Sequence, residues 1–199
     1  MRRSILLLSI MAVMVASYAG MALGASQLTN GGFENGDLSG WSVDVASGGN
    51  ASAVKSYTSN GGGVHWTPKE GSYFALLTPG AASVDTMISQ PFSASNGDKV
   101  SGWVFFQAED YSPYDDKGQV LIKDESGTVV AKTFEESVNT VGSYGNSGWR
   151  YWEHTFTGEG TFRIEARVHN LYDEILSSRI GLDDVKTSGT ADTTDPVLT

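Results

Sequence analysis

The sequence predicts an all-β protein, built as a single antiparallel sandwich or barrel. Two observations carry this prediction. Short runs of alternating apolar and polar residues fill most of the chain, and turns rich in Gly, Asn and Asp separate them. A length of 199 residues fits one domain. Glycine accounts for 24 residues, but without a Gly-X-Y period, which excludes a collagen helix.

About ten runs are expected to form strands. The range 161–169 is the clearest, because every second residue from Phe162 to Val168 is apolar and the residues between are polar. The range 99–109 carries apolar residues on both faces, which is typical of a central strand covered on both sides. In chain order the expected strands are Trp41–Val45, Ala53–Tyr57, Tyr73–Thr78, Thr86–Phe92, Lys99–Glu109, Gln119–Lys123, Thr128–Phe134, Arg150–Phe156, Thr161–His169 and Arg179–Lys186.

Three polar turns separate strands in the middle of the chain: Asn96–Asp98, Asp124–Gly127 and Gly158–Gly160. The second and third lie between alternating runs, so we expect both to close β-hairpins. Only residues 170–178 have room for a short helix. The fold is therefore expected to be almost entirely β.

The first 25 residues have the three-part layout of a secretory signal peptide. Met1–Arg3 is positive, Ile5–Ala16 is apolar apart from Ser9, and Ala22–Gly24 fits the small-x-small cleavage pattern. The apolar run is about 12 residues long, short of the roughly 20 needed to span a bilayer. We expect cleavage after this segment, no membrane span in the mature chain, and a secreted, cell-surface or periplasmic protein.

The C-terminal residues change character after Lys186. Residues 187–194 have the composition of a linker. The string from Asp192 to Thr199 resembles the opening of bacterial immunoglobulin-like repeats, which implies further domains of a longer chain. The expected organisation is a signal peptide at 1–25, one domain at 26–186, and a linker with the possible start of a further module at 187–199.

Composition excludes several functions. The net charge is −10 and the 13 Lys and Arg residues are dispersed, so nucleic acid is not an expected partner. The absence of Cys excludes disulfides, Cys-ligated zinc, iron–sulfur clusters and Cys nucleophiles. The many carboxylates would suit calcium, which is abundant outside cells.

Two strings at the ends of the expected domain carry a resemblance. Asn30–Trp41 reads NGGFENGDLSGW, and Ile180–Val185 reads IGLDDV. They resemble the first and last strands of galactose-binding-like jelly-roll domains, a fold of many carbohydrate-binding modules and of related exported bacterial surface proteins. Glu70–Leu76 and Gln90–Phe92 fall between them in the family's order. The resemblance implies a jelly-roll β-sandwich of about ten antiparallel strands.

The resemblance also implies a structural calcium ion. The family's ligands map onto Glu34 and Asp183, with Asp184 as the alternative to Asp183 and with backbone carbonyls near Gly32 and at 69–72. Alternation along a strand places Asp183 and Asp184 on opposite faces, and an inward charge is costly unless it is paired or bound. The ion would tie the first and last strands together. The alternative is that these carboxylates accept ordinary hydrogen bonds from backbone amides.

Aromatic residues, 11% of the chain, are the best indication of a ligand, because sugar rings stack on aromatic planes while carboxylates take the hydroxyl groups. Trp103 is expected in the core. Trp66 is expected to be exposed, since it follows a Gly-rich loop and precedes a proline. The predicted site residues are Trp66, Tyr111, Tyr114, Trp149, Asp115 and Asp116.

Three functions remain open. The first is a non-catalytic carbohydrate-binding module, stabilised by calcium, whose partner is a polysaccharide or a surface glycan. The second is an exported structural or adhesive sandwich without a sugar site. The third is a glycoside hydrolase or lyase, which needs two carboxylates facing each other across a groove; the acidic residues of 109–116 could also form a second cation site or a plain loop.

Overall fold

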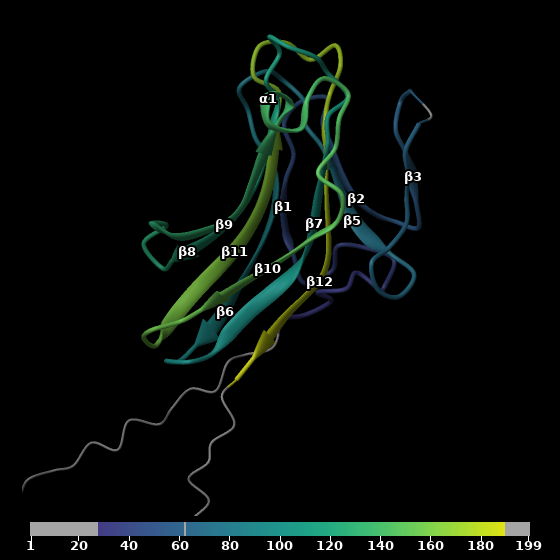
Figure 1. Cartoon of the computed structure of the whole chain (residues 1–199). Coiled ribbons are helices and arrows are strands. Elements are labelled where there is room, and N and C mark those ends of the chain that lie inside the picture. The colour runs from purple at the N-terminus through teal and green to yellow at the C-terminus, as the bar shows by residue number, and fades with distance from the viewer. Residues whose placement is uncertain (1–27, 62, 190–199) are drawn as a thin grey trace, which may run out of the picture.

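Two antiparallel five-stranded sheets face each other in the computed structural model, which describes residues 28–61 and 63–189 (Figure 1). The elements are β1 (Ser42–Asp44), β2 (Asn50–Val54), β3 (Tyr57–Thr58), β4 (His65–Trp66), β5 (Phe74–Thr78), β6 (Thr86–Ala94), β7 (Lys99–Gln107), β8 (Lys117–Asp124), β9 (Val129–Ser137), α1 (Val138–Val141), β10 (Arg150–Thr155), β11 (Gly160–His169) and β12 (Arg179–Ser188).

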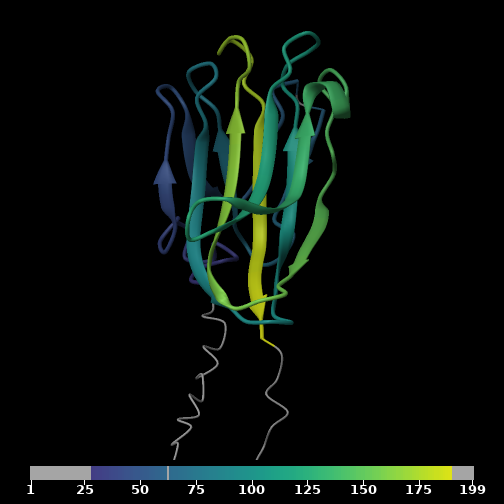
Figure 2. The same ribbon diagram turned by 90° about the vertical axis from the view of Figure 1, so that its left-hand side faces the viewer.

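The strand order is that of a jelly-roll sandwich. Sheet A runs β1-β6-β11-β8-β9, and sheet B runs β10-β7-β12-β5-β2. Most neighbours in a sheet are distant in the sequence, so the chain passes repeatedly from one sheet to the other (Figure 2). The third sheet is the small β3–β4 hairpin. The predicted fold class is confirmed, and all ten predicted strands overlap strands of the structure.

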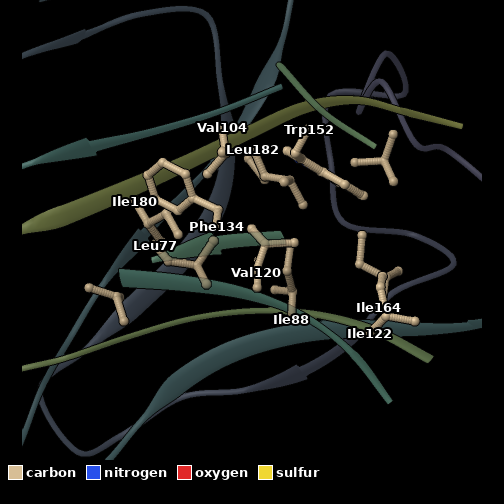
Figure 3. Packing of buried hydrophobic residues seen from close by; sticks show 14 of the residues in the cluster. Leu77, Ile88, Val104, Val120, Ile122, Phe134, Trp152, Ile164, Ile180 and Leu182 are labelled. Atoms are coloured by element: carbon tan, nitrogen blue, oxygen red, sulfur yellow. The ribbon is translucent and has the colours of Figure 1, made fainter. Parts of the chain in front are cut away.

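The core lies between the two sheets and consists of aliphatic and aromatic side chains that alternate inward along each strand. Full burial of each such side chain contributes roughly 1.5–3 kcal/mol of stability. Figure 3 shows part of this core, with Leu77, Val104, Trp152, Ile180 and Leu182 from sheet B facing Ile88, Val120, Ile122, Phe134 and Ile164 from sheet A.

The alternation predicted for 161–169 is present in β11. Ile164, Ala166 and Val168 are fully buried, while Arg163 lies exposed on the other face. Glu165 is on the outer face too but is only 4% exposed. Lys123 Nζ lies 2.7 Å from its carboxylate, and this ion pair compensates the burial.

One of the two predicted hairpins is wrong. The turn Asp124–Gly127 joins β8 to β9, which pair antiparallel with two shifts of register, so this hairpin is confirmed. The turn Gly158–Gly160 instead lies between β10, an edge strand of sheet B, and β11, an inner strand of sheet A. Alternating patterns predict the strands but not their partners, because pairing is decided by tertiary contacts.

The range 170–178, which had room for a short helix, forms a loop. The helix of the described chain is instead the single turn α1, where Asn139 N–H donates to Asp115 Oδ1 at 2.8 Å. No helix of the described residues is long and apolar enough to cross a membrane. The predicted signal peptide and the string resembling an immunoglobulin-like opening lie outside the described residues, whereas β12 extends two residues past the expected end of the domain.

Candidate functional site

Three loops gather at one end of the sandwich. They are 108–116 between β7 and β8, 142–149 between α1 and β10, and 170–178 between β11 and β12, seen together at the top of Figure 1. Backbone hydrogen bonds join the first two: Tyr144 N–H donates to Asp110 O at 2.9 Å, and Ser112 N–H donates to Ser143 Oγ at 3.1 Å. The end of β12 lies at the opposite end of the sandwich.

Four tyrosine rings form a continuous row across these loops, which we call the tyrosine end. Tyr111 contacts Tyr144 with ring centroids 5.9 Å apart and Tyr114 with centroids 5.4 Å apart. Tyr114 in turn contacts Tyr172 at 6.5 Å. Tyr111, Tyr144 and Tyr172 are 41%, 57% and 64% exposed, and Tyr114 is half-buried. The row therefore presents aromatic surface to solvent.

The two tyrosines predicted from the sequence belong to this row, and two others were missed. Tyr144 lies in a Gly- and Ser-rich loop and holds a left-handed backbone (φ 58°), which is costly for a residue with a side chain. Tyr172 lies in the one segment that had room for a short helix. A bulky aromatic residue inside a loop, with no alternating apolar neighbours, is the signal that could have identified both.

A small hollow of about 70 Å³ opens beside the row. It is lined by Tyr111, Tyr114, Asp110, Asp173, Ile175 and Leu176. Asp110 is only 3% exposed, and its carboxylate accepts a hydrogen bond from Tyr111 N–H at 2.8 Å. Burial, reinforced by the charge of Asp173, raises the pKa of Asp110 above its ordinary value. A second hollow of about 350 Å³ is lined by Glu174 and Ser177 of the 170–178 loop together with Gly48 and Pro79.

The predicted pair Asp115 and Asp116 positions the loops. Asp116 is 1% exposed and accepts hydrogen bonds from Ser178 Oγ at 2.8 Å and from the N–H groups of Ser178 and Leu171. Burial raises the pKa of Asp116 to about 6. Asp115 is half-buried and accepts from Asn139 N–H. Asp116 therefore holds the 170–178 loop against the 108–116 loop, and it does not belong to the lining of the hollow.

Trp66 is not exposed, contrary to expectation. It is 6% exposed, its ring stacks on Phe105 with centroids 3.8 Å apart, and its Nε1–H donates to Gln107 Oε1. The β3–β4 hairpin folds Trp66 onto the outer face of sheet B, where a second hydrophobic cluster forms. A Gly-rich loop next to a tryptophan indicates a turn, and here that turn allows the ring to fold back onto the sheet. Neither face of Trp66 is free for a sugar.

Trp149 belongs to the same cluster rather than to the tyrosine end. It is half-buried, meets Phe105 edge-on at 4.7 Å, and donates from Nε1–H to Thr67 O at 3.1 Å. Trp103, expected in the core, is half-buried on this outer face, where it meets Tyr151 and the ammonium of Lys69 lies 4.1 Å from the centre of its ring. The side chain of Lys69 covers the ring of Trp103, so little of this ring is free to stack on a ligand.

Glu34 and Asp183 bind the same loop through its backbone amides. The carboxylate of Glu34 accepts from the N–H groups of Ser72 and Tyr73 at 2.9–3.0 Å. The fully buried Asp183 accepts from Lys69 N–H at 2.7 Å and from Glu70 N–H at 3.0 Å. Burial raises the pKa of Asp183 to about 6, although these N–H groups act in the opposite direction. Both acids therefore anchor the 69–73 loop.

Asp184 is placed differently from Asp183. It has a left-handed backbone (φ 47°) at the irregularity in the pairing of β12 with β7, and its carboxylate lies 2.7 Å from Lys186 Nζ. The two acids have different environments: Asp183 lies on the outer face of sheet B beside its register partner Trp103, buried under the 69–73 loop, whereas Asp184 is partly exposed and ion-paired. Among residues 28–61 and 63–189, no three His, Asp or Glu side chains are arranged to hold a metal ion. Calcium at Glu34 and Asp183 stays a prediction.

A larger groove of about 540 Å³ crosses the outer face of sheet A. Its lining includes Arg163, the Lys123–Glu165 ion pair and the turn at Asp124–Gly127, with Phe162 as its aromatic residue. Charges of both signs are already paired across part of this surface. The groove therefore lacks the row of exposed rings that distinguishes the tyrosine end.

No protein-family model and no curated protein matches the sequence. Solved structures do match in fold. The module TmCBM61, solved in complex with β-1,4-galactotriose, is 20% identical with a TM-score of 0.51, and the match covers 82% of this chain and 97% of that one. The K3 cleaved adhesin domain of Lys-gingipain from Porphyromonas gingivalis is 19% identical with a TM-score of 0.52, and the match covers 83% of this chain and 100% of that domain.

Proposed function

We propose that the chain is a secreted, non-catalytic carbohydrate-binding domain whose ligand contacts the tyrosine end. The observation that carries this proposal is the row of four tyrosine rings, three of them largely exposed, held by three hydrogen-bonded loops at one end of the sandwich. Such rings offer apolar faces for sugar C–H groups and hydroxyl groups for hydrogen bonding. The end of β12 lies at the opposite end of the sandwich from these rings.

The likeness to TmCBM61 supports this proposal, since that module was solved with a bound galactotriose. The fold alone does not decide function, so the proposal depends on the residues of the site. The buried carboxylate of Asp116 accepts backbone and hydroxyl hydrogen bonds that hold the loops, so it is not free to act on a glycosidic bond. The likeness to an adhesin domain makes an adhesive sandwich the alternative.

A glycan-array screen of the full chain, run with calcium and with chelator, tests the proposal. We expect binding to at least one glycan class. It should weaken by about fivefold or more in Tyr114→Ala and in Tyr172→Ala, because a ring stacked on an aromatic side chain contributes on the order of 1–3 kcal/mol where nucleic-acid bases are bound in this way. Tyr151→Ala is the matched control: this tyrosine is 51% exposed but lies on the outer face of sheet B.

Two results would contradict the proposal. A folded chain that binds no glycan on a broad array would favour the adhesive or structural alternative. Binding that survives both tyrosine substitutions but fails in Tyr151→Ala would move the site to sheet B. Circular dichroism of each variant separates loss of binding from loss of folding.

A further inference from the structure

We infer that the hollow at the tyrosine end binds the ammonium group of an amino sugar, so that the ligand is a cationic, de-N-acetylated glycan. This inference rests on the proposed function, since it names the class of glycan for the same site. Three observations lead to it: the unpaired carboxylates of the hollow, the arrangement of the rings around it, and its size.

The carboxylates of the hollow have no cationic partner among the described residues. Asp110 is almost fully buried and Asp173 half-buried, and neither forms an ion pair within residues 28–61 and 63–189. Elsewhere in the same molecule, the buried Glu165 is paired with Lys123. A buried negative charge costs free energy unless a positive group compensates it. A cationic group of the ligand would supply that compensation.

The rings around the hollow have the arrangement that suits a cation. Tyr111 and Tyr114 both line it, and their planes meet at 78°. Tyr172 adjoins Tyr114 at 75°. The negative face of an aromatic ring attracts ammonium groups, so an ammonium group in a hollow lined by two tyrosine rings can gain from such a contact. Carboxylates combined with aromatic faces favour a cation over a neutral hydroxyl group.

The volume limits which part of a ligand can enter. About 70 Å³ is room for only a few water molecules, and therefore for a small functional group rather than a sugar ring. The ring of the sugar would lie outside, against Tyr172 or Tyr144, which are the two most exposed tyrosines of the row. The same carboxylates would repel uronic acids and sulfated sugars.

Calorimetry with matched oligosaccharides tests the inference. The full chain is titrated with glucosamine oligomers and with N-acetylglucosamine oligomers of equal length, in chelator, at low and at physiological salt. We expect about tenfold tighter binding of the glucosamine oligomer, which corresponds to one charge-assisted interaction. In Asp173→Asn this preference should fall to threefold or less.

A control is needed because the whole chain carries a net charge of −10 and attracts any polycation. Asp44→Asn changes the net charge by the same amount at an exposed position of the edge strand β1. It should leave the preference unchanged, and the preference of the unmodified chain should persist at physiological salt.

Each other outcome overturns the inference in a distinguishable way. Equal affinity for both oligomers contradicts an ammonium site but leaves carbohydrate binding intact. The same holds if Asp173→Asn and Asp44→Asn reduce the preference for the glucosamine oligomer equally. Binding that appears only when calcium replaces chelator, and that is lost in Asp173→Asn but not in Glu34→Gln, assigns the hollow to a metal ion instead. Absence of binding to every glycan on the array contradicts the proposed function itself.

Discussion

Two buried aspartates combine structural anchoring with an unfavourable charge. Asp116 and Asp183 each hold a loop through backbone N–H groups, and burial raises the pKa of each to about 6. Between the ordinary value of 3.8 and about 6, the folded chain binds more protons than the unfolded chain. The free energy of unfolding therefore falls as the pH rises through this window, by at most about 1.4 kcal/mol per pH unit and group.

We therefore predict that the chain is more stable at pH 5 than at pH 7, and that Asp116→Asn weakens this dependence. The stabilising contribution is complete below pH 3.8 and is lost as the pH rises through about 6. Urea denaturation at several pH values measures it, with Asp44→Asn as an exposed control. If the pH dependence of stability is unchanged in Asp116→Asn, the pKa of Asp116 is the same in the folded and the unfolded chain, which contradicts the prediction.

At the residue scale the sequence identifies acids and aromatic residues but not their environments. Tyr111 and Tyr114 were predicted in the site and lie in the tyrosine row. Trp66 was predicted as exposed but is covered, because exposure depends on where the β3–β4 hairpin folds. Tyr172 was missed, because its loop joins the site through tertiary contacts such as the hydrogen bonds of Asp116, which the sequence does not show.

At the scale of elements, the positions of the strands follow from the alternation of apolar and polar residues. The sheet to which each strand belongs does not. The ten predicted strands are present, yet the turn at Gly158–Gly160 connects two sheets instead of closing a hairpin. The two-residue strands β3 and β4 are too short to show a period. Their hairpin is stabilised from outside, since Tyr57 O–H and Asn60 N–H both donate to the buried carboxylate of Glu109.

The packing between β12 and that hairpin yields a prediction for Gly181. A Cβ at this position would lie 2.0 Å from Phe105 Cε1, and Phe105 stacks directly on Trp66. Gly181→Ala should therefore destabilise the chain by about 1–3 kcal/mol, the usual cost of overpacking, and expose Trp66. Denaturation monitored by tryptophan fluorescence measures both effects.

Gly158→Ala is the control for this substitution, because a Cβ at Gly158 meets no atom within 4 Å. It should change stability by less than about 0.5 kcal/mol, as expected for an open surface position. Equal stability of the two variants would show that Phe105 can move aside, and that the hairpin is held by Glu109 rather than by the ring stack.

At the scale of the whole molecule, contacts between the two ends of the domain close the sandwich. Val185 N–H in β12 donates to Gly31 O in the opening segment at 2.9 Å. Glu34 from that segment and Asp183 from the last strand both hold the 69–73 loop. This arrangement explains how two short strings at opposite ends of the sequence predict one fold: both contribute to a single junction.

The same junction is where the predicted calcium ion would act, and its presence can be decided by stability. If calcium binds at Glu34 and Asp183, a concentration of one hundred times Kd stabilises the folded chain by about 2.7 kcal/mol and raises Tm by several degrees. Chelator should abolish this gain, and so should Glu34→Gln. The ion would also keep Asp183 ionised, so the pH dependence of stability should be weaker in calcium than in chelator.

The hydrogen bonds of the structure support the alternative, in which no calcium ion binds at Glu34 and Asp183. Each oxygen of Glu34 and Asp183 accepts at least one backbone N–H, which can satisfy these carboxylates without an ion. In that case Tm is the same in millimolar calcium and in chelator, and Glu34→Gln destabilises the chain equally in both. Thermal unfolding of the two proteins in the two buffers separates the cases, because only a bound ion makes the cost of the substitution depend on calcium.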